Sequence, residues 1–244
     1  MSARITLATA LRVLTQLRRD PRTIMLIVAV PILLVTLLKY VFRGSSVFDR
    51  IAGPMLGLFP FISMFVVTSI TMQRERVGGT LERLMTMPLA KLDLLGGYAA
   101  AFAAVAAVQA VAICAWSILV LDLELERSVG IVVALATANA ILGMALGLFA
   151  SAFARTEFQA VQFMPALVLP QILLCGLFVD RADMARVLEL ASYALPLTYA
   201  YEAIDRVTSP GPLGTAFWTD VAMIGVGVVL ALVLAAATLR RRTV

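Results

Sequence analysis

The sequence contains no histidine, and only 14% of its 244 residues are charged. Without imidazole, haem ligation through histidine, histidine-bound zinc and Ser-His nucleophilic catalysis are all excluded. The chain has two cysteines, Cys114 and Cys175, and both fall inside long apolar runs. We interpret them as packed thiols rather than as a disulfide or as metal ligands. We expect no catalytic residue, no bound cofactor and no metal site in this chain.

A phosphate-binding loop is also missing. No GxxxxGK[ST] pattern occurs, and neither Lys39 nor Lys91 follows a glycine-rich turn. We therefore expect that this chain does not bind the phosphates of ATP by itself.

Apolar residues are abundant: 61% of the chain is hydrophobic and the mean hydropathy is +0.97. A helix needs about 20 mainly apolar residues to cross a bilayer, where each backbone amide must be bonded within its own segment. Six runs meet this requirement, and they predict an all-α membrane protein with one six-span transmembrane domain over residues 23–244. The predicted spans are 23–42, 51–72, 94–121, 128–154, 158–179 and 217–239.

Residues 1–22 precede the first span and mix apolar residues with arginines at helical spacing. This pattern predicts an amphipathic helix lying in the inner membrane interface and ending at Asp20-Pro21. A disordered leader is the alternative. Since no small-residue cleavage site follows the first span, we expect that span to be retained rather than removed as a signal peptide.

Basic residues concentrate on one side of the predicted topology. The N-terminal segment, the loop 73–93, the turn 155–157 and the C-terminal tail hold 13 of the 20 basic residues but five of the 15 acidic ones. The positive-inside rule therefore places these segments and both termini in the cytoplasm. The net charge of +5 reflects this topology and contact with anionic lipid, and we expect no nucleic-acid partner.

The predicted spans carry no Asp, Glu, Lys or Arg away from their ends. Ion-coupled carriers commonly keep an ionisable residue at mid-membrane, so the sequence disfavours that class. Neutral polar residues do occur within the spans, and they either bond to neighbouring helices or line a substrate path. The candidates for such a path are Gln109, Asn139, Gln162 and Gln171. Gly143 and Gly147 have the spacing that is typical of close helix packing.

The most polar run of the chain is RERVGGTLERLMTMPL, residues 74–89. Gly78 and Gly79 are expected to end the preceding helix, and Thr80 to cap a short helix that Pro88 closes. Leu81, Leu84 and Met85 would share one side of it. Such a helix either docks into a groove of another protein or lies on the lipid surface.

The run resembles the E-R-x-x-G-T-x-E-x-L-x-x-x-P signature of the ABC type-2 exporter permeases. In that family, this segment is the coupling helix that docks onto the ATPase subunit. The resemblance implies that ATPase coupling falls to Arg74, Glu75, Arg76, Gly79, Thr80, Leu81, Glu82, Arg83, Leu84 and Pro88.

Residues 195–206, LPLTYAYEAIDR, are similar to a second segment of the same family, which precedes its last span. Tyr201 departs from the small or aliphatic residues that are usual there. The predicted extracellular segment 180–216 carries short helices, which by resemblance close the exit of a path or, alternatively, lie on lipid heads. The implied outer gate is Pro196, Leu197, Thr198, Tyr199 and Glu202. From the residues alone, Glu202 and Asp205 need no explanation beyond solvation at the surface.

The resemblance covers the whole chain and implies a permease subunit of an ATP-driven exporter in a bacterial cytoplasmic membrane. Its implied partners are two ATP-binding cassette subunits, which hold ATP and magnesium, and a second permease copy or a homologous permease. The apolar interior favours a hydrophobic or amphiphilic cargo, drug-like or lipid-like, moved outward; a polysaccharide or glycolipid is the alternative within the family. An ion-coupled carrier and a membrane-embedded lipid-modifying enzyme are the alternatives from other classes.

Overall fold

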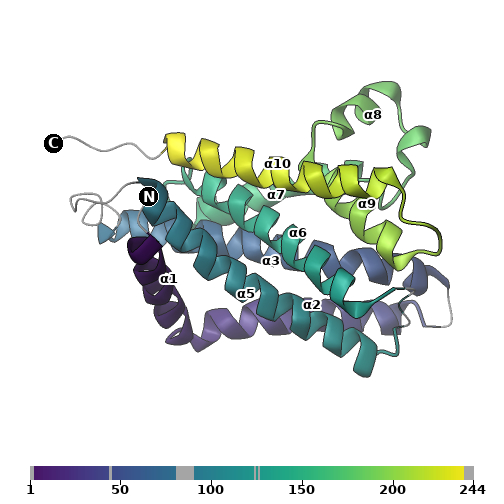
Figure 1. Cartoon of the computed structure of the whole chain (residues 1–244), viewed down its shortest axis with the longest axis horizontal. Coiled ribbons are helices and arrows are strands. Elements are labelled where there is room, and N and C mark those ends of the chain that lie inside the picture. Colours follow the sequence, from purple (N-terminus) through teal and green to yellow (C-terminus); the bar gives the residue numbers. More distant parts are fainter. Residues whose placement is uncertain (1–2, 44–45, 81–90, 124, 126, 239–244) are drawn as a thin grey trace.

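The computed structural model describes residues 3–43, 46–80, 91–123, 125 and 127–238, and no strand occurs among them. The chain forms a bundle of long helices, with α3 and α6 running through its middle (Figure 1). The long helices are α1 (Ala3–Arg18), α2 (Pro21–Val41), α3 (Ser46–Val77), α5 (Lys91–Leu119), α6 (Val129–Ser151), α7 (Glu157–Leu174) and α10 (Thr215–Thr238). The shorter elements are η1 (Arg181–Asp183), α8 (Arg186–Ser192) and α9 (Pro196–Thr208).

Six of these helices are long and apolar enough to cross a membrane, as the sequence predicts: α2, α3, α5, α6, α7 and α10. Two of their starts are fixed by capping. Asp20 accepts a hydrogen bond from the backbone N–H of Thr23 at the start of α2, and Thr156 accepts one from Gln159 at the start of α7.

The predicted fifth span, 158–179, is too long, since α7 ends at Leu174 and Gly176 adopts a φ of +103°. The end of the second span also needs correction. The sequence places the end of the second span at Met72 and a loop over 73–93, whereas α3 continues to Val77 and α5 begins at Lys91. Hydropathy falls at Gln73, but nothing breaks the helix before Gly78 and Gly79. Gly79 adopts a φ of +69°, a left-handed conformation that glycine tolerates best. The residues 74–76 are therefore helical, and the predicted short helix from Leu81 onward lies outside the described residues.

The central helices touch through glycine. A Cβ atom added to Gly143 or Gly147 would overlap the carbonyl oxygen of Phe61 or Phe65 on α3. The GxxxG spacing therefore does what the sequence predicts, since it lets the backbones of α6 and α3 approach closely. Much of α2, α7 and α10, by contrast, exposes large apolar side chains, as expected of surfaces that face lipid.

The N-terminal residues form the helix α1, as the sequence predicts, and this helix packs against the bundle. It lies across one end of the bundle (Figure 1), and its Ala10 and Val13 are buried in a cluster with Leu94, Tyr98 and Phe102 of α5. The sequence predicts an amphipathic helix in the inner interface and does not specify what its apolar side contacts. Here its apolar side packs on protein, while Leu7 and Leu11 remain exposed.

Candidate functional site

The residues of the signature that the structure describes lie at the end of the bundle covered by α1, which we call the basal end. It comprises α1, the last turn of α3, the first turns of α5 and the start of α7. The opposite end, residues 175–214, is called the distal end. Arg74, Glu75, Arg76, Gly79 and Thr80 all lie at the basal end, whereas Leu81, Glu82, Arg83, Leu84 and Pro88 lie outside the described residues.

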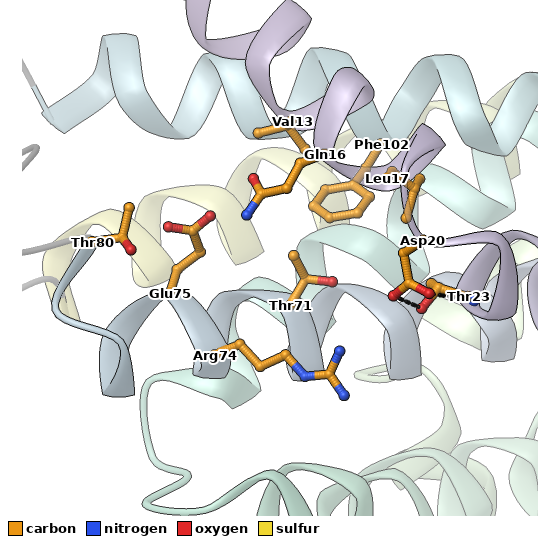
Figure 2. Close-up of a pocket in the computed structure, with 10 residues that line it drawn as sticks. All are labelled: Val13, Gln16, Leu17, Asp20, Thr23, Thr71, Arg74, Glu75, Thr80 and Phe102. Carbon is orange, nitrogen blue, oxygen red and sulfur yellow. Dashed lines mark hydrogen bonds between the residues drawn. The ribbon is translucent and has the colours of Figure 1, made fainter.

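Consecutive residues in the last turn of α3 have very different environments. Arg74 is exposed, Glu75 is 4% exposed, and Arg76 is intermediate. Successive side chains of an α-helix point about 100° apart, so neighbouring positions of the signature face different helices. Figure 2 shows Glu75 directed toward α1 and Arg74 directed away from it.

Glu75 and its partner Arg12 join three helices. Its carboxylate lies 3.5 Å from Arg12 of α1, and Arg12 also donates a hydrogen bond of 2.6 Å to the hydroxyl of Tyr98 on α5. The guanidinium stands 5.7 Å from the centroid of the Tyr98 ring, within cation–π range. A buried carboxylate is costly unless a cation compensates it. The basal ends of α1, α3 and α5 are therefore held together as one unit, which we call the basal junction.

Arg74 makes a different kind of contact. Its Nε and one terminal nitrogen donate to the two oxygens of Glu157 at 2.9 and 3.0 Å, which is the bidentate arrangement that suits Arg and carboxylate. Glu157 opens α7, so this ion pair connects α3 to α7. Both side chains are about half exposed, and exposed pairs of this kind contribute only about 0.2–1 kcal/mol. The contact orders the two helix ends but can be broken at little cost.

A pocket of about 180 Å³ lies beside the basal junction (Figure 2). Gln16, Asp20 and Thr23 line it from the α1–α2 corner, and Thr71, Arg74 and Glu75 line it from α3. Thr80, another of the predicted coupling residues, also lines it. The pocket thus connects the signature to the corner between α1 and α2.

Sequence reasoning missed three residues of this site: Arg12, Tyr98 and Glu157. In the sequence, Arg12 and Glu157 counted only as charges at the membrane boundary, and Tyr98 as one residue of the predicted span 94–121. No local spacing relates them to the signature, because 63 positions separate Arg12 from Glu75 and 83 separate Arg74 from Glu157. Pairing across the fold was needed to find them.

The four predicted path residues lie on three different helices, α5, α6 and α7. Gln109 donates to the carbonyl of Ile27 on α2, and Asn139 donates to the carbonyl of Ala200 on α9. Gln171 donates to Leu167 within α7 and accepts from the N–H of Leu197 at 3.4 Å. All three are buried, whereas Gln162 is exposed on α7. The hydrogen bonds that join helices account for the polarity of Gln109 and Asn139, and their role in a substrate path stays a prediction.

The predicted outer-gate residues begin α9 at the distal end. Pro196 occupies its first turn, and Leu197 and Thr198 are buried. The Thr198 hydroxyl donates to the carbonyl of Ser192, and the Tyr199 hydroxyl donates to that of Tyr193. The start of α9 is therefore tied to the end of α8.

Glu202 is not a solvated surface residue, contrary to the expectation from the residues alone. It forms ion pairs with Arg181 and Arg206, and Arg206 also binds Asp220 of α10 at 3.0 Å. Burial raises the pKa of Glu202 above its ordinary value, although the two arginines oppose that shift. No sequence pattern indicated this network, since Arg181, Arg206 and Asp220 come from η1, α9 and α10.

Comparisons with known proteins agree with this arrangement. The family model described as ABC-2 type transporter matches residues 6–207, which span α1 to α9. The chain is also similar to "ABC transporter G family member 20" of Dictyostelium discoideum, with 25% identity over 181 residues. That match covers 74% of this chain but 25% of the relative, so the chain spans about a quarter of the relative's length. Because the family model covers most of the chain, from the basal junction through the start of α9 and its outer-gate residues, the protein belongs to the ABC-2 type transporter family.

Proposed function

We propose that this chain is the membrane permease of an ATP-driven exporter and that separate ATP-binding cassette subunits supply the work. The observation that carries the proposal is the basal junction. It places the start of the signature where α1, α3 and α5 are fastened together, so a force applied to residues 78–90 would reach three helices at once. The name of the Dictyostelium relative, an ABC transporter, supports the same reading.

We assign the energy source to a partner protein. The chain carries no phosphate-binding loop, so ATP and magnesium would be held by the partner. Two ATPase subunits would each press on one coupling segment, including Leu81, Glu82, Arg83, Leu84 and Pro88. Six spans form half of the usual exporter core, and a second permease copy or a homologous permease would complete it. Closure of the ATPases would then move two rigid permease halves and open a path outward.

The cargo would be hydrophobic or amphiphilic, drug-like or lipid-like. The long helices bury apolar residues together with a few neutral polar ones and keep carboxylates and cations near their ends. Such an interior offers dispersion contacts and neutral hydrogen bonds rather than fixed charges. We place the protein in a bacterial cytoplasmic membrane with both termini inside, in agreement with the charge distribution.

The test is reconstitution of the permease with the ATP-binding subunit that co-purifies with it, followed by assays of ATP hydrolysis and of outward movement of fluorescent amphiphiles and lipids. A Glu82→Lys variant should still insert and bind its partner but should uncouple hydrolysis from transport. Glu189→Lys, the same charge change at the distal end, serves as the control. Transport by the purified chain alone, or normal coupling in a Glu82→Lys complex, would overturn the proposal.

A further inference from the structure

Helix α7 is attached to the rest of the protein by a polar contact near each end. At the basal end, Glu157 binds Arg74 of α3 through two hydrogen bonds of 2.9 and 3.0 Å. Near the distal end, Gln171 accepts a hydrogen bond from the backbone N–H of Leu197, in the first turn of α9. One helix thus reaches from the signature residue Arg74 to the predicted outer gate.

Between these contacts, α7 packs on the core through one narrow face, with Phe163 and Met164 partly buried beside it. Of its 18 residues, only Ala160, Val168, Gln171 and Ile172 are buried. A helix with so small a buried face can shift along its axis or tilt without dismantling a core, and small sliding of packed helices is a common mode of conformational change. The helix is about 27 Å long at 1.5 Å per residue. Pro165 and Pro170 each remove one of its backbone hydrogen bonds, and the remaining bonds would carry a displacement from one end to the other.

The two contacts made by neighbouring signature residues differ in strength. Glu75 is buried and paired with Arg12, which also binds Tyr98, so α1, α3 and α5 would stay together when the basal end moves. The Arg74–Glu157 pair is about half exposed on both sides. Since an exposed pair breaks and re-forms at little cost, α7 can follow α3 or be released from it.

We infer that the Arg74–Glu157 ion pair is a positioning contact through which movement of the basal end of α3 is passed along α7 to the start of α9. Arg74 and Glu157 do not touch cargo in this inference; they set the position of α7. The inference rests on the proposed function, because it assumes that an ATPase moves the basal end.

Thr198 supplies a reporter at the far end of this connection. It is fully buried in the first turns of α9. A Thr198→Cys parent, made with Cys114→Ala and Cys175→Ala, can be reconstituted with the ATP-binding subunit in proteoliposomes. Its reaction with an impermeant maleimide at the distal face is measured without nucleotide and with ATP trapped in a hydrolysis-deficient ATPase. In the parent we expect ATP to raise the labelling rate at least about fivefold, the size of a modest coupling between two sites.

Three variants of this parent test the ion pair. Arg74→Glu and Glu157→Gln should each reduce the ATP-dependent rise to less than about twofold, while the ATPase still co-purifies. The double variant Arg74→Glu/Glu157→Arg re-forms the ion pair with its charges exchanged and should restore most of the ATP-dependent rise in labelling. If Arg74 served only to dock the ATPase, this exchange would not restore the rise. Arg155→Glu is the matched control: Arg155 is exposed, lies on the same turn as Glu157, and should keep the full response.

The outcomes separate the two proposals. If ATP leaves the labelling of the parent unchanged, ATP-driven opening is wrong and the proposed function fails together with the inference. If the parent responds and the Arg74→Glu and Glu157→Gln variants respond equally, the inference alone is overturned. Because Glu157→Gln keeps a polar side chain at the start of α7, it remains informative even if a charge reversal there impairs folding.

Discussion

At the scale of single residues, the contrast between Glu75 and Arg74 shows that adjacent positions of one motif can serve different purposes. Glu75 is buried and paired with Arg12, while Arg74 is exposed and paired with Glu157. The motif identified both residues as functional, but it assigned both to docking. Only the three-dimensional pairing shows that each also fastens α3 to other helices.

The first prediction concerns Arg12. Arg12→Ala leaves the buried Glu75 carboxylate without its cation, and an unsatisfied buried polar group costs about 1–3 kcal/mol, more if it is charged. The variant should therefore melt at a lower temperature in detergent than the wild type. Combining Arg12→Met with Glu75→Gln should recover part of the loss, because no charge is then left buried.

Arg4→Ala provides the matched control, since Arg4 is exposed on the same helix. Its melting temperature should stay close to that of the wild type. Equal melting of the Arg12→Ala and Arg4→Ala variants would mean that the Arg12–Glu75 contact does not stabilise the basal junction.

At the scale of helices, sequence patterns predicted most of the elements, but they did not predict where every helix ends or which helices pack together. Hydropathy located all six spans, because the bilayer imposes a length on apolar runs. It failed at the last turn of α3, since Gln73 to Arg76 are polar yet remain helical up to the glycines. It also could not show that α1 rests on α5, because an amphipathic pattern states that one side is apolar but not what covers it.

The second prediction concerns the contact between α6 and α3. Gly143→Ala places a methyl group against the carbonyl of Phe61, and overpacking of this kind typically costs about 1–3 kcal/mol. We expect a lower melting temperature in detergent and reduced yield of folded protein. Gly225→Ala in α10 is the matched control: nothing lies within 4 Å of an added Cβ there, and alanine is favoured over glycine in a helix by about 1 kcal/mol. Equal effects of the two substitutions would contradict close packing of α3 on α6.

At the scale of the whole molecule, the architecture separates a basal end, where motif residues meet several helices, from a distal end, where α9 packs beside α10 and α8 projects away from them (Figure 1). The sequence predicted the two ends from charge and from two short motifs. It could not predict the connection between them, because Arg74 and Glu157, like Gln171 and Leu197, come together only when separate helices pack. A permease needs both ends joined if work done at one is to alter the other.

The last prediction tests which end faces the cytoplasm, on which the proposed mechanism depends. An ATP-binding subunit can press on the basal end only if that end is inside, and the excess of basic residues there favours this orientation. A cysteine replacing the exposed Val187 of α8 should react with an impermeant maleimide in intact cells. A cysteine replacing the exposed Arg155 should react only after the membrane is permeabilised. Both native cysteines, Cys114 and Cys175, are buried and are changed to alanine so that each variant carries one reactive thiol. Labelling of the Arg155→Cys variant in intact cells would place the basal end outside, beyond the reach of any intracellular ATPase.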